Sequence, residues 1–253
     1  MDLNCDMGES FGSYTLGMDH EVIKHITSAN IACGFHAGDP LVMDTTVQMA
    51  VENGVGVGAH PGFPDLQGFG RRKMDATYVE VKNDVIYQIG ALKAFCMLHG
   101  VKLQHVKPHG ALYLSAVDNE NIAKACADAI MSVDPNLIFV ALAGAKGERM
   151  RKIGEETGLK VAYEAFPDRA YTPDGNLASR RLPDAVIKDP EIVAERAVRM
   201  AKEGKIIAID GTIIEIEAQT LCVHGDNPKA VSLVKTIREN LEAEGVTLIP
   251  MGE

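Results

Sequence analysis

The sequence predicts a single α/β domain, and a closed barrel of parallel strands is favoured over an open sheet. Short apolar runs alternate with amphipathic, helix-type stretches throughout the chain. No linker-like or low-complexity segment interrupts the 253 residues, a length that suits one barrel. We therefore treat residues 1–253 as one domain.

The first half of the chain is expected to consist of strand–helix units. Strands are predicted over 1–5, 31–33, 55–60 and from 106, and helices over 18–26, 40–52 and 78–99. The start of the helix at 40 is specified locally, because Asp39 can accept hydrogen bonds from free backbone N–H groups and Pro40 suits the first helical position. Gly100 is the expected end of the following helix.

The second half continues the alternation. Helices are predicted over 119–131, from about 148 to 158, and over 191–203 and 229–244, and strands over 137–142, 160–163, 221–223 and, closing the chain, 247–249. Asp210-Gly211 between β-branched runs predicts a hairpin over 206–216. The loop 172–189 is long enough to act as a lid or docking element.

Composition and charge exclude several classes of protein. The net charge is −10 and no basic block offsets it, which argues against a nucleic-acid or anionic-membrane partner. No apolar run approaches the roughly 20 residues that a transmembrane helix needs. The N-terminal segment lacks a basic and then apolar leader, and the five cysteines are scattered without a CxxC pair. We expect a cytoplasmic protein.

Histidines recur at equivalent places in the pattern. His36, His60, His109 and His224 each follow a short apolar run and lie next to turn residues. The carboxyl ends of parallel strands meet at one face, so we expect these side chains to converge in a cleft together with Asp6. They could be metal ligands, acid–base groups or hydrogen-bonding partners of a substrate, and Asp6, His36 and His60 are the candidates for a metal.

Carboxylates accompany these histidines. Asp6 and Glu9 crowd the end of the first strand, where they could act as acid and base or hold a cation, or belong to a solvated turn. Asp39, Asp65 and Asp226 stand close to the histidine-bearing turns and are candidates for binding substrate or phosphate. Asp39 could equally be a helix cap, and Asp226 a plain turn residue.

Three cations are candidates for anion binding. Lys107 interrupts an apolar run, either as a lysine at the edge of the apolar surface or as a cation aimed at an anionic substrate, and we favour the second. At the mouth of a strand we expect it to be dispensable for packing. Arg169, with Glu164 and Asp168 nearby, could bind a carboxylate or phosphate or form a structural ion pair, and Arg71 is a weaker anion-binding candidate.

Several well-known motifs are missing from the sequence. The GVGVG stretch over 54–58 lacks the third glycine of a dinucleotide fingerprint, and no GxxxxGK[ST] phosphate loop occurs. HExxH and GxSxG are also absent. A P-loop nucleotide site, a helical zinc-protease site and a serine nucleophile of the hydrolase type are therefore not predicted.

Five motifs in order resemble one family. The LamB/YcsF family, the A subunits of bacterial 5-oxoprolinases, is similar to this chain in DLNCDMGESFG (2–12), NIACGFHAGDP (30–40), GAHPGFPDLQGFGRR (58–72), VKPHGALY (106–113) and CVHGDNP (222–228). The resemblance implies a distorted, seven-stranded TIM-like β/α barrel of the glycoside hydrolase/deacetylase type. It also implies ATP-dependent hydrolysis of 5-oxo-L-proline (pyroglutamate) to L-glutamate, with ADP and phosphate as products and B and C subunits as partners.

The resemblance carries a set of site residues over to this chain, namely Asp6, Glu9, His36, Asp39, His60, Asp65, Lys107, His109, His224 and Asp226. Opening a lactam through phosphorylation of its carbonyl oxygen needs cations, a base for water and an acid for the departing nitrogen. Lys107 or Arg169 would supply the cation, a histidine the base, and Asp6 or Glu9 the acid or a ligand of the Mg²⁺ that accompanies ATP.

Two other functions remain open from the sequence. A metal-dependent deacetylase or amidohydrolase, acting on a small or carbohydrate substrate, predicts a tightly bound divalent ion and activity without ATP. A chain that only binds a small acid and regulates its partners predicts binding without turnover. For the 5-oxoprolinase, we expect the isolated chain to turn over its substrate poorly.

Overall fold

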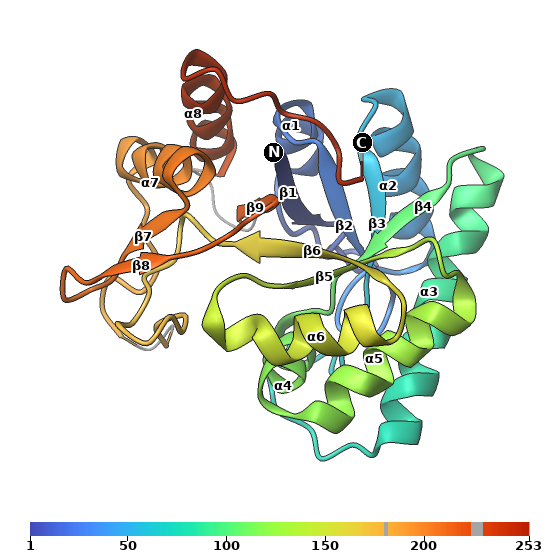
Figure 1. Cartoon of the computed structure of the whole chain (residues 1–253). Helices are drawn as coiled ribbons and strands as arrows, with labels where there is room; N and C mark the ends of the chain where they lie inside the picture. Colours follow the sequence, from blue (N-terminus) through green and yellow to red (C-terminus); the bar gives the residue numbers. More distant parts are fainter. Residues whose placement is uncertain (180–181, 224–229, 253) are drawn as a thin grey trace.

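A computed structural model describes residues 1–179, 182–223 and 230–252, and its centre is a closed barrel of parallel strands (Figure 1). Neighbours around the barrel follow the order β1-β2-β3-β4-β5-β6-β9. The strands are β1 (Asp2–Met7), β2 (Ser28–Ala32), β3 (Gly56–His60), β4 (Leu103–Val106), β5 (Ile138–Leu142), β6 (Lys160–Ala165) and β9 (Thr220–Val223). The barrel closes because β9 pairs with both β1 and β6. The predicted seven-stranded α/β barrel is confirmed.

Helices surround the barrel (Figure 1). They are α1 (Asp19–Val22), α2 (Pro40–Glu52), α3 (Tyr78–Leu98), α4 (Gly110–Asp118), α5 (Glu120–Val133), α6 (Glu148–Glu156), α7 (Pro190–Glu203) and α8 (Ala230–Ala243), with 3-10 turns at Ile23–His25 and Ala145–Gly147. The start of α2 is the one predicted from Asp39-Pro40. A capping box between Thr77 and Glu80 starts α3. None of the described helices is long and apolar enough to cross a membrane.

The structure differs from the predicted secondary structure at three places. The strand expected from 106 begins at Leu103, because Gln104 and His105 are polar and hide it in the hydropathy pattern. Helix α4 was not expected, since its first residue is a glycine with φ of 49° that reads as a turn. The strand expected over 247–249 is not formed: the barrel is already closed, and this segment makes only isolated backbone bonds to Met1.

The predicted hairpin is confirmed and lies outside the barrel. Strands β7 (Lys205–Ile207) and β8 (Ile213–Glu215) pair antiparallel, in a sheet of their own. In Figure 1 this hairpin projects away from the barrel beside α7.

A large part of the barrel interior is polar. The side chains of Asp2, Asn4, Asn30, His105 and Glu164 are all buried. At the amino end, hydroxyl groups of neighbouring strands donate to the Asp2 carboxylate, yet burial still raises its pKa. Side-chain hydrogen bonds join this end to the carboxyl end through Thr220, Asn4 and Asn30.

Glycines in β3 make room for this interior. A Cβ atom on Gly58 would lie 1.9 Å from His105 Nε2, and one on Gly56 would lie 2.5 Å from Gln104 Oε1. The GVGVG stretch therefore has a packing reason, the close approach of polar side chains from β4.

Candidate active site

A cavity of about 580 Å³ lies at the carboxyl ends of the barrel strands. Its wall includes the buried side chains of His60, Lys107 and His109 and the partly buried side chain of Asp6, which lie at or just after the ends of strands β1, β3 and β4. The exposed part is formed by Arg71 and other residues of the loop before α3, by α4, and by the segment around Leu177. A polar cavity at this face is the usual place for a site in a β/α barrel.

Lys107 is the centre of a buried charge network. Its Nζ lies 2.8 Å from Asp6 Oδ1, 2.9 Å from Glu164 Oε1 and 3.0 Å from Cys222 Sγ. Burial alone lowers the pKa of Lys107, but Asp6, Cys222 and Glu164 together raise it well above its usual value. The expectation that Lys107 is dispensable for packing was wrong, because this ammonium group is 3% exposed and neutralises two carboxylates.

Asp6 joins Lys107 to His60. Its Oδ1 accepts from Lys107 and, at 2.9 Å, from Asn30 Nδ2. Its Oδ2 lies 3.3 Å from His60 Nε2. Asn30 is itself fixed, because its amide oxygen lies 2.8 Å from His105 Nε2. The carboxylate is therefore held between a cation and an imidazole at the cavity wall.

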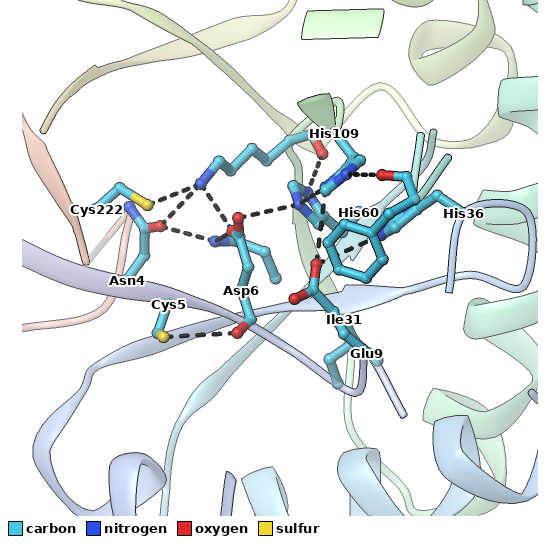
Figure 2. Close-up of polar contacts among 12 residues, drawn as sticks. Asn4, Cys5, Asp6, Glu9, Ile31, His36, His60, His109 and Cys222 are labelled. Carbon is cyan, nitrogen blue, oxygen red and sulfur yellow. Dashed lines mark hydrogen bonds and ion pairs between the residues drawn. The ribbon is translucent and has the colours of Figure 1, made fainter. Parts of the chain in front are cut away.

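Three of the predicted histidines come together. His60 Nε2 is 2.9 Å from His109 Nδ1, and the two rings are perpendicular. The ring of His36 stacks on that of His109, with centroids 3.7 Å apart and planes inclined by 2° (Figure 2). The expected convergence with Asp6 is thus observed for His36, His60 and His109, whereas His224 lies outside the described residues.

Gly70 allows this close packing. Its φ is 62°, a conformation that suits glycine, and a Cβ there would lie 2.7 Å from His36 Cβ and 2.8 Å from His109 Cδ2. The glycine-rich loop after β3 therefore follows a path that other residues could not take without displacing the histidines.

Glu9 completes a group that could hold a metal ion. Its Oε1 lies 3.6 Å from His36 Nε2 and 3.7 Å from His109 Nδ1. One ligand atom from each of Glu9, His36, His60 and His109 lies within 4.8 Å of all the others. Burial first, and neighbouring histidines second, lower the pKa of His36 well below its usual value and that of His109 to about 3. Both rings are thus neutral at pH 7, the form in which histidine binds metals.

The structure does not bring every predicted residue into the cavity. Asp39 caps α2 by accepting from Leu41 and Val42, and its other oxygen accepts from Gly12 N at 2.6 Å. Asp65 pairs with Arg72, which lowers the pKa of the carboxyl group. Neither aspartate lines the cavity.

Asp226 lies outside the described residues. Both predicted arginines, Arg71 and Arg169, line the cavity. Arg71 lies over the Phe69 ring, 4.9 Å from its centroid. Arg169 donates to Ala178 O at 2.7 Å and to Ala185 O at 3.3 Å, so it also braces the loop after β6.

Sequence reasoning missed two buried groups. Glu164 was named only as a neighbour of Arg169, although its inward position at the end of β6 pairs it with Lys107. Tyr113 lines the cavity with a buried hydroxyl whose pKa is raised by burial and by the nearby Glu164. Neither that hydroxyl nor Glu164 Oε2 makes a well-formed hydrogen bond within the part of the chain that the structure describes. Glu164 stands outside the five motifs quoted above. Tyr113 ends the motif VKPHGALY, but nothing in that pattern shows that its hydroxyl faces the cavity.

A closed parallel barrel with a buried acid, lysine and histidines facing a cavity at its carboxyl end has the architecture of a β/α-barrel enzyme. The comparisons with known proteins place it more closely. The chain belongs to the LamB/YcsF family, whose family description matches residues 1–253.

Relatives match over the full length. A protein of Natranaerobius thermophilus, named as the A subunit of 5-oxoprolinase, is 60% identical over 252 residues, covering 100% of this chain and 97% of its own. One of Pyrococcus furiosus with the same name is 57% identical, covering 100% and 98%. The crystal structure of a lactam utilization protein from Thermus thermophilus is 48% identical, with a TM-score of 0.92, covering 99% and 98%.

A more distant structure shares only the fold. A putative cellobiose-phosphate cleavage protein of Enterococcus faecalis has a TM-score of 0.55 at 10% identity, covering 98% of this chain and 96% of its own.

Proposed function

We propose that this chain is the A subunit of a cytoplasmic 5-oxoprolinase. The complete enzyme hydrolyses 5-oxo-L-proline to L-glutamate and converts ATP, accompanied by Mg²⁺, to ADP and phosphate. B and C subunits are the proposed partners. The names of full-length relatives at 60% and 57% identity support this function, as does the lactam utilization protein among the solved structures.

The observation that carries the proposal is the Lys107–Asp6–His60 constellation on the buried wall of the cavity. A cavity of about 580 Å³ has room for a small lactam. Arg71 and Arg169 line the same cavity and can attract the substrate carboxylate.

The chemistry suits these groups. Phosphorylation of the lactam oxygen makes the ring carbon electrophilic, so that water can add to it and the ring nitrogen can leave with a proton. A second water then releases phosphate from the open-chain acyl phosphate, which leaves glutamate. His60 is the proposed base for water, since its Nε2 lies beside the Asp6 carboxylate, and Lys107 stabilises negative charge that develops at the carbonyl.

The test measures glutamate release with ATP for the isolated chain and for the complex reconstituted with both partner subunits. We expect little turnover from the chain alone, because its sequence lacks a P-loop and a dinucleotide fingerprint. In the complex, His60→Gln should lower the rate by about 100-fold or more, the contribution of a general base. His20→Gln, an exposed histidine of α1, is the matched control.

Two outcomes would refute parts of this proposal. Equal rates for the isolated chain and the complex would disprove the dependence on partners. A properly assembled complex that releases no glutamate would disprove the reaction itself.

A second candidate is an ATP-independent, metal-dependent amidohydrolase or deacetylase. The cluster of Glu9, His36, His60 and His109 favours it, because such enzymes hold a divalent ion with histidine and carboxylate ligands. Hydrolysis of acetylated sugars or small amides by the isolated chain with a divalent metal, and without ATP, would support this function over the first.

A further inference from the structure

We propose that the chain binds one first-row transition-metal ion through His36 Nε2, His60 Nε2, His109 Nδ1 and Glu9 Oε1. The inference stands on the geometry of these side chains. It bears on the proposed role of His60, because a lone pair that Nε2 donates to the ion can no longer accept a proton, so His60 can act as the base for water only while the ion is absent. It also differs from the Mg²⁺ proposed to accompany ATP, because the ligands are mainly nitrogen atoms.

The tautomers of two histidines follow from their outer hydrogen bonds. His60 Nδ1 lies 2.7 Å from the carbonyl oxygen of Lys107. His109 Nε2 lies 2.8 Å from the carbonyl oxygen of Phe69. A carbonyl oxygen can only accept, so each of these nitrogens must carry the hydrogen of its ring. With one hydrogen on each ring, His60 Nε2 and His109 Nδ1 are then both lone-pair acceptors.

These two acceptors face each other. His60 Nε2 and His109 Nδ1 are 2.9 Å apart, a distance at which two lone pairs repel unless a positive species is shared between them. Two carboxylate oxygens close to them are acceptors as well: Asp6 Oδ2 lies 3.3 Å from His60 Nε2, and Glu9 Oε1 lies 3.7 Å from His109 Nδ1. The arrangement therefore calls for a cation.

The environment of His36 favours a bound metal ion over a proton shared by His60 and His109. His36 is completely buried, and neither of its ring nitrogens has a hydrogen-bond partner within the described residues. A buried polar atom left without a partner costs about 1–3 kcal/mol. A proton shared by His60 and His109 would leave both nitrogens of His36 in that state. A metal ion can bind His36 Nε2 together with the other two imidazoles and Glu9, so that only His36 Nδ1 remains without a partner within the described residues.

Distances and outer contacts also suit a metal. Metal–ligand bonds of about 2.1 Å in a tetrahedral site place ligand atoms about 3.4 Å apart. The separations of 2.9, 3.6 and 3.7 Å lie on both sides of this value, and all four ligand atoms lie within 4.8 Å of one another. Binding would therefore draw the ligands together, and the parallel rings of His36 and His109 would have to tilt so that both lone pairs point at the ion. Histidine ligands commonly donate their other N–H to a backbone carbonyl, as His60 and His109 do here.

The ligand set selects the class of metal. Imidazole ligands suit zinc, copper, iron and nickel, whereas magnesium requires oxygen ligands and retains its water. Three imidazoles and one carboxylate therefore favour an ion such as Zn²⁺ or Co²⁺ over Mg²⁺.

The experiment removes metal from the purified full-length chain with a chelator and titrates it with Co²⁺, Zn²⁺ or Mg²⁺. We expect one equivalent of Co²⁺ to bind with visible absorption bands of nitrogen coordination, Zn²⁺ to raise the melting temperature, and Mg²⁺ to do neither. His36→Gln and Glu9→Gln should each weaken Co²⁺ binding by about 10-fold or more, while His99→Gln, whose ring instead contacts Asp44, should not.

A measurement on the unchanged chain covers the case in which a variant fails to fold. Nitrogen-15 spectra of the histidine rings should show three imidazoles perturbed together by Zn²⁺. Binding of well under one equivalent, or unchanged affinity in a folded His36→Gln chain, would overturn the proposal. So would spectra that show a proton shared by His60 and His109 while His36 is unaffected by Zn²⁺.

Discussion

Replacing Lys107 by methionine tests the buried charge network most directly. Methionine keeps much of the length and apolar surface of the lysine but removes the ammonium group. Asp6 and Glu164 would then lose a cation that lies 2.8 and 2.9 Å from their oxygens. The side chain of Glu164 is 0% exposed and that of Asp6 13% exposed, so water cannot replace the lysine fully.

The expected loss of stability is large. Removing one partner of a buried ion pair costs about 3–5 kcal/mol, because a charge is left in the interior without compensation. Each kcal/mol shifts the melting temperature of a protein of this size by about 2–4 °C. The melting temperature at pH 7 should therefore fall by roughly 6–20 °C.

The loss should depend on pH with a definite sign. Without Lys107, the two carboxylates would carry uncompensated charge in the interior at neutral pH, and this cost disappears when they are protonated in the folded chain. A group whose pKa is raised on folding contributes stability below its unfolded pKa and loses it as the pH rises. The difference in free energy of unfolding between the variant and the unchanged chain should therefore be greatest at neutral pH and become smaller as the pH falls toward 4.

Denaturation by urea at several pH values measures this effect. Lys235→Met, at an exposed lysine of α8 paired with Glu239, is the matched control and should cost less than about 1 kcal/mol. Adding Glu164→Gln to Lys107→Met should restore part of the stability, because it removes one of the unpaired charges. A Lys107→Met chain within about 1 kcal/mol of the unchanged chain at pH 7 would refute the assignment of a buried network.

Two further substitutions test local features. Asp39→Ala should lower the free energy of unfolding by about 1–2 kcal/mol, because it removes the cap of α2 and the hydrogen bond from Gly12. Asp39→Asn should lower it by less. Equal stability of both variants and the unchanged chain in urea would show that Asp39 does not cap the helix. Gly58→Ala should lower the free energy of unfolding by about 1–3 kcal/mol, because its Cβ would collide with His105. Gly90→Ala, which has open space on α3, should leave the stability unchanged or raise it. Similar effects at both glycines would contradict the close packing of Gly58 against His105.

Features specified by neighbouring residues were predictable from the sequence. The start of α2 is specified locally by Asp39 and Pro40, so the sequence alone predicts it. The gathering of three histidines was also predictable, because the carboxyl ends of parallel strands share one face whatever their register.

Features that depend on closure of the barrel were not predictable from the sequence. Glu164 reaches Lys107 only because β6 and β4 both line the same interior, which no local pattern reveals. Polar side chains of β4 point into that interior, so the apolar run that marks a buried strand was broken at Gln104 and His105. Asp65 was misjudged for the opposite reason: it stands beside a histidine turn in sequence, but its partner Arg72 lies in its own loop.

The polar interior of the barrel has a consequence for engineering. A buried ion pair is often less favourable than well-packed hydrophobic side chains of similar volume. Redesigning the positions of Asn4, Asn30, Lys107 and Glu164 with complementary apolar residues could therefore give a more heat-resistant barrel that has lost its cavity chemistry. Asp6 and His105 would have to change together with these four residues, because Asp6 pairs with Lys107 and His105 pairs with Asn30. Efforts to stabilise this protein are better directed at its outer helices.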